Sequence, residues 1–316
     1  MKKLAVKDKY TKQNIRREFL FLGLHGEFAT QPNSVNVPFD ADLEKPRSTR
    51  NSKGWLLPHL LAWETVENGR WFYWYKAKNR KRIPTDGIPQ LRFHESGEST
   101  AAYKMIDKCV EKLRYNTWDA FQDLVDWLLW GLDWKDARFP EISDEQDDWL
   151  YRNFDLKLLL DPGDHLGYYY ENAVVSRFKQ KANGFFSTPI DVCHLMARMI
   201  YGEETDKSVA ILEPCAGTGK MLMVSSNYSL NLRGMDIDGF LVKICILNGY
   251  LFMPWLVAPD DFVDKHNELH RKKIEDVLAE NAPSKELANA ILDGLPDGHP
   301  YKKAIEKAVE MHVIDK

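Results

Sequence analysis

Apolar residues recur at three- and four-residue steps between positions 101 and 135, with acidic residues between them. The series is Ile106, Val110, Leu113, Trp118, Phe121, Leu124, Val125, Leu128 and Leu129. This spacing places the apolar side chains on one face of a helix. We therefore expect helical structure over 101–135.

The pattern changes near residue 165, where helical stretches begin to alternate with short apolar runs. This alternation is typical of a parallel α/β sheet. Residues 136–165 are acidic and turn-rich, so we place a domain boundary there. The expected parts are a separate, mainly helical N-terminal domain over 1–150, an α/β domain over 151–263 and C-terminal helices over 264–316.

Residues 55–92 of the N-terminal part are aromatic-rich and basic. Five consecutive aromatic residues (71–75) lead into Lys76, Lys78, Arg80, Lys81 and Arg82. Aromatic faces stack on bases and cations hold phosphates, so the run has the composition of a nucleic-acid-binding segment. We favour the alternative in which the aromatic residues are core, because five in succession cannot all face one ligand.

Composition and charge narrow the classes of protein. The chain has 316 residues, 44% of them hydrophobic, which indicates a globular protein with a core. Residues 1–100 carry 18 Lys and Arg against 11 Asp and Glu, although the whole chain is at −4. This asymmetry is either a nucleic-acid footprint or a solvated surface. Four scattered cysteines and no long apolar run predict a cytoplasmic protein without a metal site or membrane span.

The strongest chemical signal is the stretch VAILEPCAGTGKML at 209–222. It predicts a strand ending at Glu213, a tight turn with Gly217 and Gly219, and then a helix. Glycine lets the backbone approach a ligand closely. A phosphate-binding loop does not fit, because Pro214 and Met221 stand where that loop needs Gly and Ser or Thr.

A second acidic residue follows at the interval expected for a ribose contact. Asp236 comes 19 residues after Gly217, at the end of a second apolar run. A carboxylate there lies at the tip of the neighbouring parallel strand and can accept both hydroxyls of a ribose. The pair of strand ends predicts an adenosine-type pocket.

Three motifs in order resemble the adenine-N6 DNA methyltransferases, a family that includes the modification subunit of type I restriction systems and related phage and plasmid enzymes. Residues 184–189 (GFFSTP) look like the segment that opens its catalytic domain, and 213–219 (EPCAGTG) resemble its S-adenosylmethionine motif. Residues 234–238 (GMDID) are similar to its ribose motif, and 164–171 (DHLGYYYE) to the helix before them. The resemblance covers about residues 160–260.

The resemblance implies a Rossmann-like, S-adenosylmethionine-binding sheet and assigns roles in it. Thr188 beside Pro189 would contact the methionine end of the cofactor, and Asp236 would hold the ribose. Ile237 would lie against the adenine, with Phe185 or Phe186 as another candidate for that contact. The turn around the methionine end comprises Glu213, Pro214, Cys215, Ala216, Gly217 and Gly219. Double-stranded DNA is the implied substrate.

The base-binding motif of the family, D/N/S-P-P-F/Y/W, has no counterpart in the chain, which contains no Pro-Pro pair. The nearest trace is Asn281-Ala-Pro283-Ser, but its surroundings favour a charged surface helix over a catalytic strand. Strands that normally complete the sheet are also not visible after Asp238, so we expect an incomplete sheet.

Two functions therefore stay open. One is a DNA adenine methyltransferase, or a subunit whose protein partner completes a modification complex. The other is a catalytically inactive, methyltransferase-like protein that binds DNA or protein.

Overall fold

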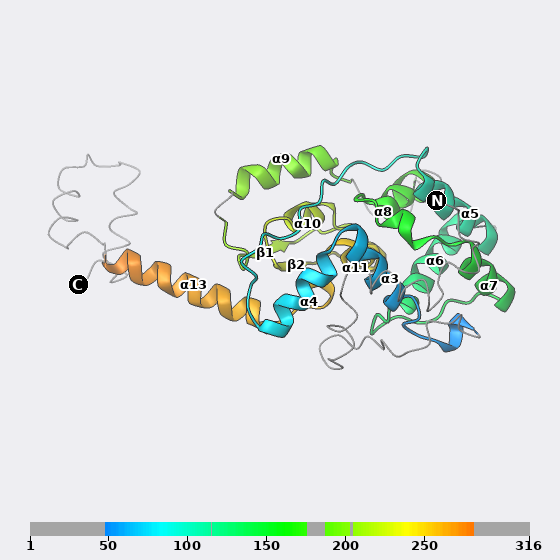
Figure 1. Cartoon of the computed structure of the whole chain (residues 1–316). Helices are drawn as coiled ribbons and strands as arrows, with labels where there is room; N and C mark the ends of the chain where they lie inside the picture. The colour runs from blue at the N-terminus through cyan, green and yellow to red at the C-terminus, as the bar shows by residue number, and fades with distance from the viewer. Residues whose placement is uncertain (1–47, 115, 176–186, 203–204, 281–316) are drawn as a thin grey trace. The chain divides into compact units, whose positions relative to one another are not determined.

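The computed structural model describes residues 48–114, 116–175, 187–202 and 205–280. In these ranges, two parallel strands form a sheet. Strand β1 (Ala210–Glu213) pairs with β2 (Asn231–Gly234), from Ala210 opposite Asn231 to Glu213 opposite Gly234. Helix α10 (Lys220–Ser225) connects them (Figure 1). In the described ranges the protein is thus helix-rich with a two-stranded parallel sheet, compatible with an incomplete α/β fold. The Rossmann-like arrangement and the separate N-terminal domain stay predictions.

Helices pack around this pair of strands. Helix α9 (Ile190–Ile200) packs on α10, as does α11 (Gly239–Phe252), and α12 (Pro254–Val257) contacts α11 and β2. Helix α11 is apolar around most of its circumference, which explains its burial. It begins at Asp238, whose carboxylate accepts the backbone N–H of Phe240 at 2.8 Å.

The N-terminal half consists of helices. They are η2 (Thr49–Asn51), α3 (Leu57–Glu67), α4 (Arg70–Arg80), α5 (Ala101–Leu113), α6 (Thr117–Gly131), α7 (Asp144–Asn153), η3 (Leu156–Leu159), α8 (His165–Tyr169) and the π-helical η4 (Tyr170–Val175). Helices α5 and α6 confirm the helical structure expected over 101–135. They are separate because the Asn116 side chain caps α6. Helix α7 lies in the region expected to be turns, where Ser143 and Gln146 form a capping box.

The aromatic run at 71–75 lies on α4, and most of it is core. Trp71, Tyr73, Trp74 and Tyr75 are buried, which confirms the interpretation favoured from the sequence. The indole N–H of Trp71 donates to the Tyr250 carbonyl at 2.8 Å. Helix α4 therefore packs against the end of α11 with its aromatic face.

The basic end of α4 is partly engaged within the chain. The Lys78 side chain is buried and donates to the Ala258 carbonyl at 3.4 Å, and Lys81 pairs with Asp260 at 2.7 Å. Arg80 and Arg82 are exposed. Only part of this basic run is therefore presented to solvent.

Arg70 joins the two halves of the described chain. Its guanidinium is fully buried and donates to the carbonyl of Phe252 at 2.8 Å, to the hydroxyl of Ser226 at 2.6 Å and to the side chain of Asn227. A further bond goes to the Pro89 carbonyl at 2.9 Å. These contacts join residues on the two sides of the domain boundary expected near residue 150. That domain boundary stays a prediction.

Two compact units are distinguished along the chain, one up to Val263 and one from Asp264 to Lys316. Helix α13 (Asp261–Glu280) begins at the end of the first unit and continues into the second. The helices expected after position 280 lie outside the described residues. No helix in the described part is long and apolar enough to cross a membrane.

Acid should destabilise the protein through His59 on α3. Burial lowers the pKa of this imidazole to about 3, so the folded state keeps it neutral where an unfolded chain with pKa 6.5 takes up a proton. Its contribution is present above pH 6.5 and is lost as the pH falls. Between pH 7 and pH 5 that loss is about 2 kcal/mol. Urea unfolding of the wild type and His59→Leu at both pH values measures it as the difference in pH dependence. Equal pH dependence in the two proteins would contradict the prediction.

Candidate active site

The glycine turn between β1 and α10 has the conformation that its sequence predicts. Gly217 and Gly219 both have positive φ values, 53° and 94°. A Cβ atom on Gly219 would lie 2.8 Å from the Cys245 sulfur on α11, so a larger residue has neither the space nor the backbone conformation. The turn is held to the end of β2, because Ala216 N–H donates to the Met235 carbonyl at 2.9 Å.

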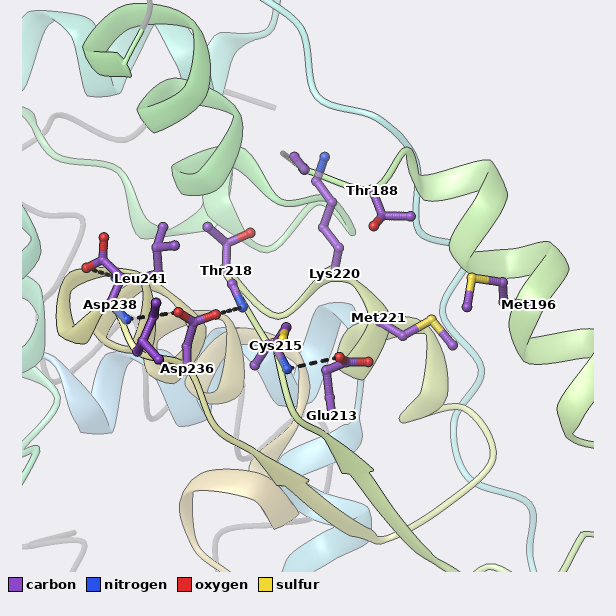
Figure 2. A pocket seen from close by; sticks show the side chains of 14 residues that line it. Thr188, Met196, Glu213, Cys215, Thr218, Lys220, Met221, Asp236, Asp238 and Leu241 are labelled. Atoms are coloured by element: carbon purple, nitrogen blue, oxygen red, sulfur yellow. Dashed lines mark hydrogen bonds between the residues drawn. The ribbon is translucent and has the colours of Figure 1, made fainter. Parts of the chain in front are cut away.

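Asp236 follows β2 and faces the turn, as Figure 2 shows. One carboxylate oxygen accepts the backbone N–H of Gly217 at 2.8 Å, and the other accepts that of Asp238 at 2.9 Å. These bonds hold the carboxylate at the carboxyl ends of the two strands, where ligands bind in open parallel sheets. Each oxygen keeps a further lone pair for a ligand hydroxyl.

A pocket of about 440 Å³ opens at these strand ends, within the range of small-molecule sites. Among the residues predicted from the sequence, the pocket is lined by Thr188, Glu213, Cys215, Ala216, Gly217, Asp236 and Ile237. The Ile237 side chain is 97% exposed, which leaves its apolar surface uncovered at the pocket. The structure thus gathers the turn, the strand-end carboxylate and the segment before α9 around one cavity.

Other predicted residues do not line the pocket. Pro189 is the N-cap residue of α9, Pro214 lies in the turn, and Gly219 is the N-cap residue of α10, whose N–H donates to the Ala216 carbonyl at 2.8 Å. Phe185, Phe186, Asn281 and Pro283 lie outside the described residues.

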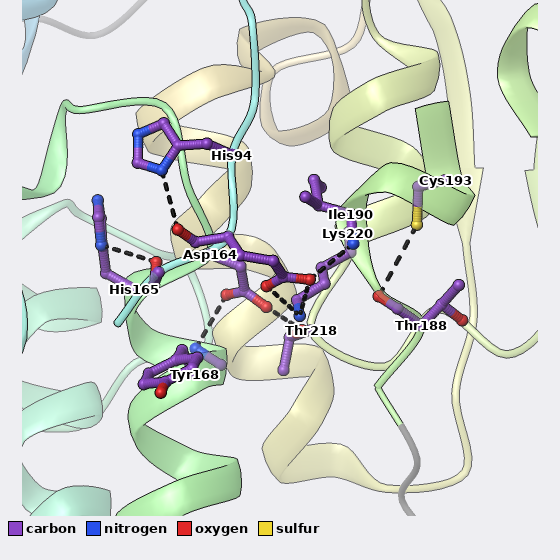
Figure 3. Close-up of polar contacts among 12 residues, drawn as sticks. His94, Asp164, His165, Tyr168, Thr188, Ile190, Cys193, Thr218 and Lys220 are labelled. Atoms are coloured by element: carbon purple, nitrogen blue, oxygen red, sulfur yellow. Dashed lines mark hydrogen bonds and ion pairs between the residues drawn. The ribbon is translucent and has the colours of Figure 1, made fainter. Parts of the chain in front are cut away.

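A buried network centred on Asp164 supports the turn. The Asp164 side chain accepts the hydroxyl of Thr218, the backbone N–H of Gly167 at 2.9 Å and the amide of Asn248 at 2.8 Å (Figure 3). Asn248 donates a second bond to the Thr218 carbonyl at 2.8 Å. A Cβ atom on Gly167 would collide with an Asp164 oxygen, so this approach requires glycine. The start of α8 thereby positions Thr218 in the pocket wall.

A segment of the N-terminal half supports another wall of the pocket through contacts with α9 and α10. Glu95 accepts the backbone N–H of Ile190 at 2.6 Å and pairs with the Lys220 ammonium at 3.2 Å. The neighbouring Phe93 carbonyl lies 2.9 Å from Nε2 of His194. These contacts hold the start of α9, and with it Thr188, beside the first turn of α10.

The acidic side chains near this wall change the pKa of Glu171. Burial raises the pKa of Glu171, and the nearby negative charges of Glu95 and Asp164 raise it further, while Lys220 opposes the shift. The wall therefore combines one cation with several carboxyl groups.

Sequence reasoning did not identify Glu95 or Asn248 as residues that support this site. Asn248 had a signal, since it is a lone amide in an apolar helix. Glu95 had none, because its partners lie about a hundred positions away in the chain.

Residues 162–251 match the family model of the N-6 DNA Methylase. The match begins just before α8 and ends within α11, so it includes the Asp164 network, the glycine turn and Asp236. No curated protein and no solved structure was found to match the chain. The region 162–251, which carries this site, thus matches the adenine-N6 DNA methyltransferase family, in agreement with the resemblance of its motifs.

Proposed function

We propose that the chain binds S-adenosylmethionine, or its demethylated product, in the pocket at the strand ends and acts in DNA modification. The observation that carries the proposal is the position of Asp236, which is bonded to the glycine turn and faces the same cavity. Members of this family normally use S-adenosylmethionine as the methyl donor, and their substrate is DNA.

The residues of the pocket suit this cofactor. Asp236 offers two acceptor oxygens to the ribose hydroxyls, and Ile237 offers an uncovered apolar surface to the adenine. The turn from Glu213 to Gly219, with Thr188 opposite, would hold the methionine end. When bound, the cofactor supplies a methyl group activated on a sulfonium. The chain's own contribution is to orient that group.

A second candidate is a catalytically inactive, methyltransferase-like protein that binds DNA or protein without turnover. The sequence favours it in one respect, because the 316 residues contain no Pro-Pro pair. A flipped adenine needs acceptors for its amino group and a stacking ring. Another protein that supplied these groups would complete a modification complex.

Asp236→Ala is expected to weaken cofactor binding about tenfold or more. The change removes a charged acceptor of two ribose hydrogen bonds, worth roughly 1.5–3 kcal/mol. It also frees the Gly217 N–H that holds the turn. Calorimetric titration of the wild type and the variant with S-adenosylhomocysteine measures the effect.

Asp148→Ala is the matched control, because it removes a carboxylate from the surface of α7, where Asp148 pairs with Arg152. This control should bind as the wild type does. An Asp236→Ala protein with undiminished affinity would show that the ribose is not held here.

A further inference from the structure

The first residue of α10 places a cation inside the proposed cofactor pocket. The Lys220 side chain is 8% exposed and lines the cavity, together with Ser187 and Thr188. Figure 2 shows the Lys220 and Thr188 side chains near each other, apart from Asp236. The pocket is therefore lined by the carboxylates of Glu213, Asp236 and Asp238, and separately by an ammonium beside the hydroxyls of Ser187 and Thr188.

Glu95 holds the Lys220 ammonium in place, but the contacts described do not use all of its hydrogen-bond donors. Glu95 approaches it with one carboxylate oxygen at 3.2 Å and the other at 3.5 Å. An ammonium has three N–H donors, so the paired Lys220 keeps donor capacity toward the pocket. Glu95 is itself held by the Ile190 N–H at 2.6 Å. Because Glu95 fixes the direction of the Lys220 side chain, the cation stays aimed at the same wall as Thr188.

We propose that Lys220 binds the carboxylate of the amino-acid end of the ligand, with Glu95 as its positioning residue. This inference rests on the proposed function, since it takes Asp236 to hold the ribose of the same ligand. A largely buried ammonium contributes more to a carboxylate than an exposed one, because solvent screens it less. Lys220 then determines specificity, and the pocket selects adenosine derivatives that carry a carboxylate over those that lack one.

Two available ligands distinguish carboxylate binding by Lys220 from recognition of the adenosine. S-adenosylhomocysteine carries the amino-acid end, whereas 5′-methylthioadenosine has the same nucleoside and thioether without the carboxylate. Calorimetric titration of the full chain with both ligands is done for the wild type, Lys220→Met and Lys220→Arg. Methionine keeps the unbranched shape of lysine without its charge, and arginine restores the charge. Thermal unfolding of each variant checks that the fold is kept.

The wild type should bind S-adenosylhomocysteine at least tenfold more tightly than 5′-methylthioadenosine. Lys220→Met should lose about tenfold in affinity for S-adenosylhomocysteine, the order expected for one charge-assisted hydrogen bond. Its affinity for 5′-methylthioadenosine should stay within about twofold, whereas Lys220→Arg should keep the preference.

The other outcomes overturn the inference in distinguishable ways. Equal losses for both ligands would make Lys220 a structural residue of the turn, and an unchanged affinity for S-adenosylhomocysteine would put the carboxylate elsewhere. Both leave the proposed function standing. A wild type that binds neither ligand would refute the proposed function itself, and the role of Lys220 with it.

Discussion

The isolated protein is expected to methylate adenine in duplex DNA orders of magnitude more slowly than an enzyme with a complete base-binding motif, even when the cofactor is bound. A flipped adenine loses a few kcal/mol of stacking and pairing, which two acceptors and an aromatic ring normally offset. Orientation of the reacting pair contributes several kcal/mol more. The nearest sequence, Asn281-Ala-Pro283-Ser, lacks the first proline and the aromatic residue.

Transfer of a labelled methyl group to mixed-sequence DNA measures this activity, with Asn281→Ala as the control. Labelling near background in both proteins is the expected result and favours the inactive, binding function. Strong labelling that disappears in Asn281→Ala would contradict the prediction and make this tetrapeptide an active site. Strong labelling that persists in the variant would assign the chemistry to other residues.

Arg70→Leu is expected to lower the free energy of unfolding by about 3–5 kcal/mol, the range for removal of one partner from a buried charged network. The variant leaves the buried Ser226 hydroxyl and the buried Phe252 carbonyl without the donor that Arg70 supplies. The Asn227 side chain also loses a donor but keeps the bond from the Leu91 N–H. It also removes a positive charge that stabilises the carboxylate of the buried Glu64, which accepts the backbone N–H groups of Arg70 and Trp71.

Urea unfolding followed by tryptophan fluorescence gives the difference in stability. Arg152→Ala, which removes an exposed arginine from α7, should change stability by less than about 0.5 kcal/mol. A loss below 1 kcal/mol in Arg70→Leu, on the order of one ordinary hydrogen bond, would mean that the two halves of the described chain do not depend on this contact.

Arg70 also explains why the N-terminal half was hard to interpret from its sequence. An arginine before an aromatic run is read locally as the start of a basic surface segment. Its acceptors on Ser226, Asn227 and Phe252 are more than 150 positions away, so no periodicity links them to it. The aromatic face of α4 likewise contacts distant residues, because Trp71 and Trp74 donate hydrogen bonds to the carbonyls of Tyr250 and Ala258 in the other half of the chain.

Local chemistry, by contrast, could be predicted from the residues alone. The turn at Gly217 and Gly219 depends on backbone conformations that glycine adopts and other residues avoid. The position of Asp236 depends on the length of one strand–helix–strand connection, which a count of residues measures. The helices at 101–135 follow from a spacing set by helix geometry. Each of these features involves residues close together in the chain.

Only the tertiary structure decided which distant groups meet at the pocket. Lys220 and Glu95 lie 125 positions apart, and Asn248 reaches Asp164 across 84. A hydrogen bond of this kind arises from how helices pack on the strand pair, which depends on shape and burial over the whole unit. The sequence by itself therefore determined the turn and its acidic neighbour. Packing decided that a lysine held by the N-terminal half would face the same cavity, because side-chain contacts between remote segments leave no local pattern.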